Sequence, residues 1–410
     1  MVDNPPQPDP DPHPWHRLPA GVHPHPHPHH SGPRYALAHD WLCGYRGGEA
    51  VLERIAALAL ETGRVDRLYT MFDDRRPLAP AIDTLARCVS PLSALPDTWR
   101  RWLLPMYPLA VRSLARTLRT RQKHTPVDLL ISTSSAAIKG LKAPPGVPHL
   151  CYCHAPARYV WSVRSEYEGG RTIPDRLRAA GLATVGSTYR AWDRATAANV
   201  TTFLANSTHT AAEIKRCFGR AAEVVFPPVR TEFFTPDNTI PREDFWLFAG
   251  ALEPYKRADL AAEAAQLAGA KLIIVGQGSI ETTLRQRYEP AGVEFRGRVS
   301  DEHLRDLYRR AKLLVFPQIE DFGITAVEAQ GCGCPVVARH AGGALDTVLP
   351  GKTGVFFEDA DPRALAQAAA TCPQHPQACR ANAERFAESV FDNTMRTHIQ
   401  QCTDIAFHSA

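Results

Sequence analysis

Two glutamates in the stretch "FPQIEDFGITAVEAQGCGCPVV" are the residues best suited to chemistry. Glu320 and Glu328 have seven residues between them, and Gly323 is one of these. The segment Lys312–Phe316 predicts a short buried strand, whereas Ile324–Gly331 has the composition of a helix that stops at glycine. Glu320 is therefore expected in the loop at the carboxyl end of the strand, and Glu328 inside the helix that follows.

The backbone between these glutamates is predicted to bind an anion. Phe322, Gly323, Ile324 and Thr325 carry the N–H groups of the predicted helix start. Such N–H groups have no partner inside the helix, and a helix N-terminus bears about half a positive charge that favours phosphate. The segment is expected to hold a phosphate, with hydroxyl groups of the same ligand on either side.

Strands and helices alternate along the chain in two series. In the first series, "TTFLANS" predicts a strand, and the pattern Thr210-x-x-Glu213 predicts the cap of the helix after it. The second series starts with "FWLFAGAL" and continues through "TGVFFE". Alternation of this kind predicts an α/β protein of two doubly wound, Rossmann-like domains that face one another across a cleft.

The domain boundaries follow from changes in composition. A Pro/His-rich tract at 1–33 cannot form a core and is expected to be a disordered tail, and the proline-rich segment Val224–Asp244 reads as a linker. The predicted domains are residues 34–235 and 236–384, and a C-terminal helix is expected at about 385–410.

Three further loops at strand carboxyl ends carry unusual residues. Gly47 and Gly48 lie between a strand and a helix, where glycine permits close approach of a ligand, although a plain structural turn is the alternative. His154 ends the strand in "CHAPARYVW" and is either a ligand contact or a structural histidine. Lys256 and Arg257 follow the first strand of the second domain, as a phosphate-facing lysine or an ordinary surface pair.

Composition argues against several other functions. The net charge of +4 does not indicate nucleic acid, and ten cysteines without a C-x-x-C pair predict core thiols, with no metal site or disulfide framework. No apolar run reaches the roughly 18 residues of a membrane span, so a cytoplasmic protein is expected. In "VGQGSIE", Glu281 stands where a dinucleotide fingerprint needs a third glycine, and a tight backbone-approach turn is predicted instead.

A basic stretch from Thr98 to His124 has seven Arg or Lys residues and no Asp or Glu. On a helix, three arginines would share one face and two leucines another: Arg112, Arg116 and Arg119 against Leu114 and Leu118. Three aromatic residues accompany them: Trp99, Trp102 and Tyr107. Peripheral contact with an anionic membrane is the functional interpretation, and a solvated helix packed on the first domain is the alternative.

Taken in order and spacing, these elements resemble the retaining glycosyltransferases of family 4, which have the GT-B fold. The resemblance runs from Arg34 to about His398, and it is strongest in "FAGALEPYKRADLAAEAA", in "CYCHAPARYVW" and from "VEFRGRVS" through "LPGKTGV". The "CHAPARYVW" segment is similar to that of bacterial mannosyltransferases of polysaccharide assembly. The chain departs from the family at Ala251, where relatives usually carry arginine.

The resemblance implies that residues 34–235 form the acceptor-side domain and residues 236–384 the domain that binds the nucleotide-sugar donor, with the helix at about 385–410 packing back on the first domain. It also implies a role for each of these residues. Glu328 would accept hydrogen bonds from the ribose of a nucleotide-sugar donor. Catalytic roles would fall to Glu320 against the transferred sugar, to Lys256 on the diphosphate and to His154 on the first-domain side of the sugar. The other implied donor contacts are Gly47, Gly48, Arg257, Arg298, Val299, Phe322, Gly323, Ile324 and Thr325.

The implied reaction is transfer of a hexose with retention, most directly mannose from GDP-mannose, to a glycan or lipid-linked acceptor in cell-surface polysaccharide synthesis. No metal is required if Lys256 and the helix start neutralise the diphosphate. Two alternatives stay open: a UDP-sugar-dependent transferase, and a degenerate GT-B protein that binds nucleotide or glycan without turnover, which the departure at Ala251 permits. A sugar-nucleotide epimerase of similar fold would need a different set of acidic residues.

Overall fold

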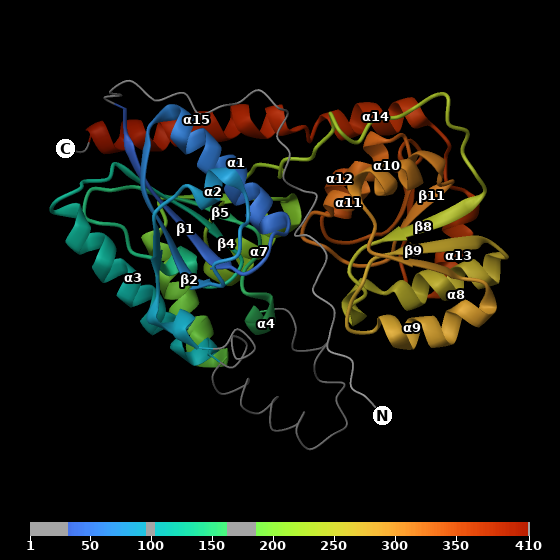
Figure 1. Ribbon diagram of the computed structural model, residues 1–410, viewed down its shortest axis with the longest axis horizontal. Coiled ribbons are helices and arrows are strands. Elements are labelled where there is room, and N and C mark those ends of the chain that lie inside the picture. The colour runs from blue at the N-terminus through green and yellow to red at the C-terminus, as the bar shows by residue number, and fades with distance from the viewer. Residues whose placement is uncertain (1–31, 96–102, 162–185, 409–410) are drawn as a thin grey trace, which may run out of the picture.

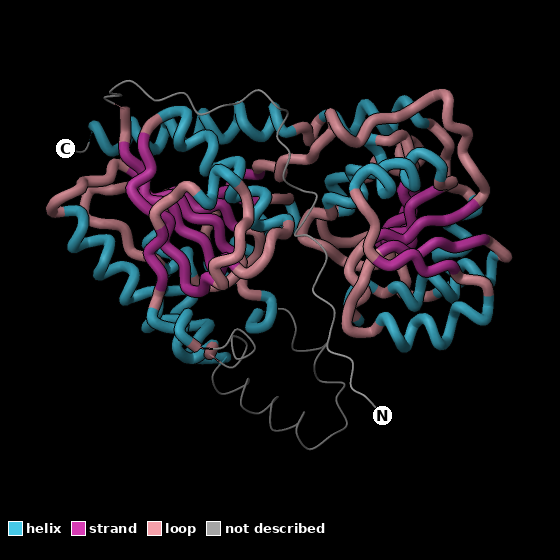
Figure 2. Tube along the Cα trace, in the orientation of Figure 1, coloured by secondary structure: helices cyan, strands magenta, loops and turns pink. Residues whose placement is uncertain are grey.

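The computed structural model describes residues 32–95, 103–161 and 186–408. Two parallel sheets, each with helices around it, form two domains that lie side by side (Figure 1), and Figure 2 shows the strands gathered into these two sheets. The predicted α/β class with two Rossmann-like domains is confirmed.

The first sheet has seven strands, all paired in parallel, in the order β3-β2-β1-β4-β5-β6-β7. Its strands are β1 (Arg34–Leu42), β2 (Arg64–Asp73), β3 (Arg87–Val89), β4 (Leu129–Ser134), β5 (His149–Cys153), β6 (Thr202–Ala205) and β7 (Glu223–Val224). Its helices are α1 (Gly47–Thr62), α2 (Pro80–Asp83), α3 (Tyr107–Gln122), α4 (Arg158–Trp161), a helix over 186–196, and α7 (Thr208–Phe218). The central strands β4 and β5 are buried at every position, as expected for a sheet with helices on both faces.

The second sheet has six parallel strands in the order β10-β9-β8-β11-β12-β13. Its strands are β8 (Phe245–Ala249), β9 (Lys271–Val275), β10 (Glu294–Gly297), β11 (Leu313–Phe316), β12 (Val336–Arg339) and β13 (Gly354–Phe357). Its helices are α8 (Ala258–Ala268), α9 (Glu281–Tyr288), α10 (Asp301–Arg310), α11 (Ile324–Gly331), α12 (Ala344–Thr347), α13 (Pro362–Ala370) and α14 (Pro376–Glu384).

The last helix, α15 (Glu388–His408), runs back from the second domain along the first (Figure 1). Phe391, Met395 and Ile399 belong to the same buried core as residues of α1 and β1, so the helix is an integral part of the first domain. Arg54 of α1 also forms an ion pair with Asp392. The chain thus crosses between the domains twice, and a bridge between Val229 and Ala387 joins the two crossings.

Side-chain caps fix where α1 and α7 begin. The Glu49 carboxylate accepts a hydrogen bond from the Arg46 N–H at 3.0 Å and closes the first turn of α1. In α7, Ser207 Oγ accepts from the Thr210 N–H at 2.9 Å. The predicted cap at Thr210 is therefore wrong, because Ser207 takes this role and Glu213 instead pairs with Arg216.

The helix α3 is amphipathic, as its sequence predicts. Arg112, Arg116 and Arg119 are exposed, whereas Leu114 and Leu118 are buried against the first domain. Tyr107 does not join the exposed side, because its ring is buried edge-on against Phe72 at a centroid distance of 5.8 Å. Trp99 and Trp102 lie outside the described residues. Among the helices the structure describes, we find none long and apolar enough to cross a bilayer.

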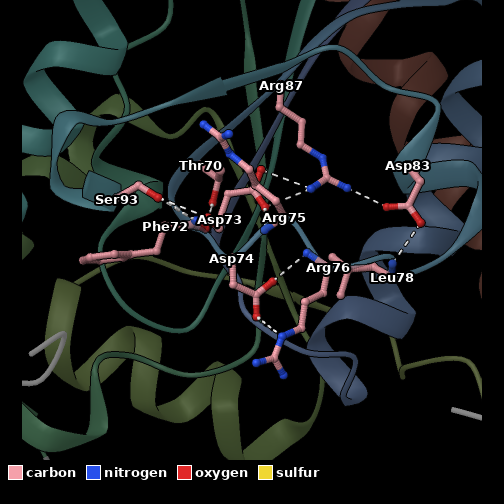
Figure 3. Close-up of polar contacts among 10 residues, drawn as sticks. All are labelled: Thr70, Phe72, Asp73, Asp74, Arg75, Arg76, Leu78, Asp83, Arg87 and Ser93. Atoms are coloured by element: carbon pink, nitrogen blue, oxygen red, sulfur yellow. Dashed lines mark hydrogen bonds and ion pairs between the residues drawn. The ribbon is translucent and has the colours of Figure 1, made fainter. Parts of the chain in front are cut away.

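A polar cluster holds the loop after β2 (Figure 3). Arg87 Nη1 donates to both Asp73 carboxylate oxygens at 2.9 and 3.1 Å, and its Nη2 donates to Asp83 at 2.5 Å. The Leu78 N–H donates to the other Asp83 oxygen at 2.8 Å, and Ser93 Oγ binds the Asp73 backbone. Because both carboxylates already have partners from their own domain, we assign this cluster a structural role.

Candidate functional site

The start of α11 is held rigidly between the two domains. Gly323 has φ of 93°, and a Cβ there would lie 2.7 Å from the Phe316 ring, so another residue would be strained and would clash. The Phe322 side chain is buried between Phe226 and Phe386, at centroid distances of 5.9 and 5.5 Å. This packing joins both interdomain crossings to α11, and it leaves backbone N–H groups as the polar groups that Phe322 and Gly323 can offer a ligand.

Lys256 and Glu320 are brought together across the loops that follow β8 and β11. The Lys256 ammonium contacts the Glu320 carboxylate, and the two side chains are only 15% and 20% exposed. Gln318 Nε2 lies 3.4 Å from the same carboxylate oxygen. Lys256 is therefore positioned at the start of α11 and neutralised by a carboxylate, an arrangement in which an anionic ligand would compete for the ammonium.

Glu328 lies inside α11, as predicted, and is 7% exposed. Burial raises the pKa of its carboxyl to about 7, with the Arg230 guanidinium acting to lower it and the Asp301 carboxylate adding to the rise. Arg230 comes from the linker and binds Asp301 at 2.8 Å. The Glu328 carboxyl is therefore partly protonated and partly ionised near neutral pH.

Two glycines at the start of α1 face different neighbours: Gly47 faces α11, and Gly48 faces two histidines of its own domain. A Cβ on Gly47 would lie 3.4 Å from Ile324 Cδ1 of the second domain. A Cβ on Gly48 would lie 3.7 Å from the His39 ring and 3.8 Å from His154 Nε2. The predicted contacts Gly47, Gly48 and His154 are thus neighbours, and Gly47 meets the predicted phosphate-binding helix directly.

His154 is a neutral hydrogen-bonding group. Within the described part of the chain its Nε2 is buried and has no hydrogen-bond partner. Burial lowers the pKa of His154 to about 3, helped by His39 and opposed by Glu49. The ring is therefore uncharged at every physiological pH, and it can donate or accept a hydrogen bond without titrating.

Asp40 organises this side of the site, and the sequence reasoning did not single it out. One carboxylate oxygen accepts from the N–H groups of Ser135 and Ala136 at 2.6 and 2.9 Å, and the other accepts from Ala137 and Ile138 at 2.8 Å each. Its neighbour His39 donates to or accepts from Thr133 Oγ1 at 2.6 Å. The adjacent polar pair "HD" at a strand end was the available signal.

The predicted turn at Gly276–Gly278 is confirmed, and its close neighbour is protein backbone. A Cβ on Gly276 would meet Gly250 O at 1.8 Å, and one on Gly278 would meet Leu252 O at 2.3 Å. Hydrogen bonds from Gly250 N to Val275 O and from Leu252 N to Gln277 O join the two loops at 3.0 and 2.9 Å. The turn thereby supports the loop that carries Lys256.

Three further predicted donor contacts lie on the loops that lead into α8 and α10. Arg257 has φ of 56°, and its guanidinium binds Asp259 of its own helix at 3.1 Å, so the structure does not place it on the predicted phosphate site. Arg298 is exposed, and Val299 packs on the core of the second domain. Both precede α10, whose first residue Asp301 binds Arg230.

Two polar contacts join the domains, and the sequence reasoning assigned them no role. Arg158 of α4 binds Asp321 of the second domain, with Nη2 to Oδ2 at 2.6 Å. The Thr208 N–H and hydroxyl of α7 bind Asp346, both at 2.8 Å. Loops after β5 and β6 therefore meet loops after β11 and β12, and we call this region the domain junction.

Seven of the ten cysteines are buried, in line with the predicted core thiols, whereas Cys43, Cys88 and Cys372 are only partly buried. In the ranges that the structure describes, no group of three or more His, Cys, Asp or Glu side chains is arranged to hold a metal ion.

The second domain has recognisable relatives. Residues 230–386 match the family described as "Glycosyl transferases group 1". The chain is also 35% identical over 154 residues to a D-inositol 3-phosphate glycosyltransferase of Mycobacteroides abscessus, a match that covers 33% of this chain and 35% of that protein. A second relative, D-inositol 3-phosphate glycosyltransferase 2 of Catenulispora acidiphila, is 33% identical over 198 residues, covering 41% of this chain and 46% of the relative. The chain thus spans less than half the length of these curated relatives.

Solved structures extend the likeness to both domains at the level of the fold. HepE of Anabaena in complex with UDP superposes with a TM-score of 0.63 at 17% identity, covering 90% of this chain and 100% of that one. Sucrose-phosphate synthase of Thermosynechococcus elongatus gives a TM-score of 0.68 at 19% identity, covering 90% and 98%. The two-domain architecture is therefore the GT-B fold of the glycosyl transferases.

Proposed function

We propose that the protein is a retaining glycosyltransferase that moves a hexose from a nucleotide sugar to a glycan or lipid-linked acceptor. The observation that carries the proposal is the placement of Lys256 and Glu320 at the start of α11, with Glu328 buried four positions into the same helix. A cation, a set of backbone N–H groups and two carboxylates then lie in the order that a diphosphate flanked by two sugars requires.

The proposed chemistry uses these groups directly. The bond between the anomeric carbon and the diphosphate oxygen breaks, and its electron pair stays on the diphosphate. The acceptor oxygen bonds to the anomeric carbon on the same face, and its proton passes to the departing phosphate oxygen. Lys256 and the N–H groups at the start of α11 offset the charge that grows on the diphosphate, and this accounts for leaving-group stabilisation without a resident metal.

Mannose from GDP-mannose is the donor we infer first, on the similarity of "CHAPARYVW" to mannosyltransferases of polysaccharide assembly. A UDP-sugar is the alternative, favoured by the UDP named with the HepE structure. The names of the sequence relatives add D-inositol 3-phosphate to the acceptors worth testing. D-inositol 3-phosphate carries hydroxyl groups, so it could supply the acceptor oxygen and proton of the proposed transfer.

Transfer and binding are measured separately in the deciding experiment. The protein is incubated with GDP-mannose or UDP-glucose and candidate acceptors, and mass spectrometry detects the added hexose. Thermal shifts with both donors and with free GDP and UDP report binding in parallel. Transfer from GDP-mannose supports the proposal. Nucleotide binding without transfer from either donor would instead support the non-catalytic GT-B alternative.

We further propose that α3 contacts an anionic membrane, as suits a lipid-linked acceptor. Its exposed side carries Arg112, Arg116 and Arg119, and Leu109 adds an apolar side chain that is 53% exposed. The protein is expected to float with anionic liposomes at low salt, and to be released by salt or by the triple change of the arginines to glutamine. Equal flotation with neutral and anionic vesicles would contradict this assignment.

A further inference from the structure

Two adjacent carboxylates at the start of α11 each hold a cation, and the cations come from different domains. Glu320 contacts Lys256 of the second domain. Asp321 contacts Arg158 of the first domain, with Nη2 to Oδ2 at 2.6 Å and Nε to Oδ1 at 3.3 Å. A two-point contact of this kind fixes the plane of a guanidinium. Arg158 is thereby held on the residue next to Glu320, the carboxylate that contacts Lys256.

The surroundings of Arg158 place it beside the lysine loop as well. Burial acts to lower the pKa of Arg158, yet Asp321 and then Glu320 and Tyr255 raise it above its ordinary value. Tyr255 is the neighbour of Lys256, so the guanidinium lies near both the loop after β8 and the loop after β11. Its side chain is 37% exposed, which leaves part of it accessible to a ligand.

The other candidate positions for a second cation either carry no charge or hold an arginine that is bound to a carboxylate elsewhere. Ala251, in the loop after β8, is exposed and uncharged. Arg257 is bound to Asp259, and Arg230 is bound to Asp301 beside Glu328. Among these candidates, Arg158 alone pairs with a carboxylate adjacent to Glu320.

We propose that Arg158 is a catalytic residue of the proposed transfer, supplying from the first domain a second positive charge that stabilises the departing diphosphate. The inference rests on the proposed function. Asp321 orients the guanidinium before the donor binds, and the planar fork then fits two phosphate oxygens. Because the charge of the diphosphate grows as the bond to the sugar breaks, Arg158 contributes mainly to the rate of transfer.

The competing role for Arg158 is a purely structural bridge between the domains. Three variants separate the two roles: Arg158→Gln removes the cation, Arg158→Lys keeps a charge without the fork, and Asp321→Asn breaks the bridge while keeping the cation. We expect Arg158→Gln to lower kcat about a hundredfold, with less effect on the donor KM, and Arg158→Lys to be intermediate. Asp321→Asn should lose no more than about tenfold, because the cation remains.

A double variant sharpens the test. Ala251→Arg places a cation on the loop after β8, so it should restore at least about tenfold of the lost kcat in the Arg158→Gln background and change the wild type little. Thermal melting of every variant controls for folding. Equal losses in Arg158→Gln and Asp321→Asn, with no rescue by Ala251→Arg, would overturn the catalytic role and leave the bridge. An inactive wild type would instead overturn the proposed function itself.

Discussion

The two sides of the domain junction are built from different chemistry. The second domain contributes charge: Lys256 on Glu320, and Glu328 beside Arg230 and Asp301. The first domain contributes shape and neutral polarity: the glycines of α1 against Ile324, and a buried His154 that carries no charge. Two charged groups also lie on this side: Arg158, which is held by a carboxylate of the second domain, and Asp40, whose carboxylate accepts four backbone hydrogen bonds.

This difference has a physical reason. A nucleotide diphosphate needs opposing charge in a place sheltered from water, where each contact is worth more than at the surface. An acceptor hydroxyl needs a close-fitting, uncharged surface that leaves room for the reacting oxygen. One domain is therefore expected to govern binding of the donor and stabilisation of the leaving group, and the other to govern the approach of the acceptor.

Removing the central cation should produce the largest effect. Lys256→Ala is expected to lower kcat at least about a thousandfold, or roughly 4 kcal/mol. The reason is that the variant lacks the partly buried ammonium that is proposed to offset the charge of the departing diphosphate. The matched control is Lys271→Ala, a 55% exposed lysine at the start of β9, which should retain activity. Transfer that survives Lys256→Ala would contradict the charged side of the comparison.

Replacement of each glutamate should affect a different kinetic parameter. Glu320→Ala is expected to lower kcat about a hundredfold, because the charge on the transferred sugar changes during the reaction. Glu328→Ala should weaken donor affinity by roughly ten- to a hundredfold and affect kcat less, because a ribose contact is similar in the ground and transition states. Steady-state kinetics with varied donor measure both. If both variants raise only the donor KM, the role of Glu320 is wrong.

The raised pKa of Glu328 predicts how donor affinity depends on pH. The carboxyl is ionised above its pKa of about 7 and protonated below it. In the proposed donor complex the ionised form would accept hydrogen bonds from the ribose hydroxyls, so affinity should be highest above pH 7 and fall by up to about tenfold per pH unit below it. Calorimetric titration of the donor between pH 5.5 and 8.5, values chosen to span about one and a half units around that pKa, measures the trend. In Glu328→Gln this dependence should disappear; if it persists, another group titrates.

The smallest effect is expected on the neutral side. His154→Gln should lower kcat/KM less than about tenfold, because one neutral hydrogen bond is replaced by another. Since the pKa of His154 is about 3, the change should leave the pH profile of kcat/KM between pH 5 and 8 unaltered. Loss of a titrating limb in this variant would show that His154 acts as an acid or base.

The charged side could be recognised before the fold was known because its signals are local. Glu320, Gly323 and Glu328 fall on one strand–loop–helix unit, so their relative positions depend on the periodicity of a single segment. The same holds for the two sheets, since strict alternation of strands and helices permits little else. The amphipathic face of α3 was also predictable, although the burial of Tyr107 depends on Phe72 of strand β2.

Contacts between segments that are distant in the sequence could not be predicted from such local patterns. Asp40 binds backbone some 95 residues away, Arg158 meets Asp321 across 163 residues, and Arg54 meets Asp392 across 338. No local pattern encodes such pairs, because they depend on how strands are ordered in a sheet and how one domain rests on the other. The sequence by itself determined which residues line each strand end. Tertiary structure alone decided that Arg158 reaches Asp321 of the second domain, because a long cationic side chain pairs with a carboxylate that only the fold brings near.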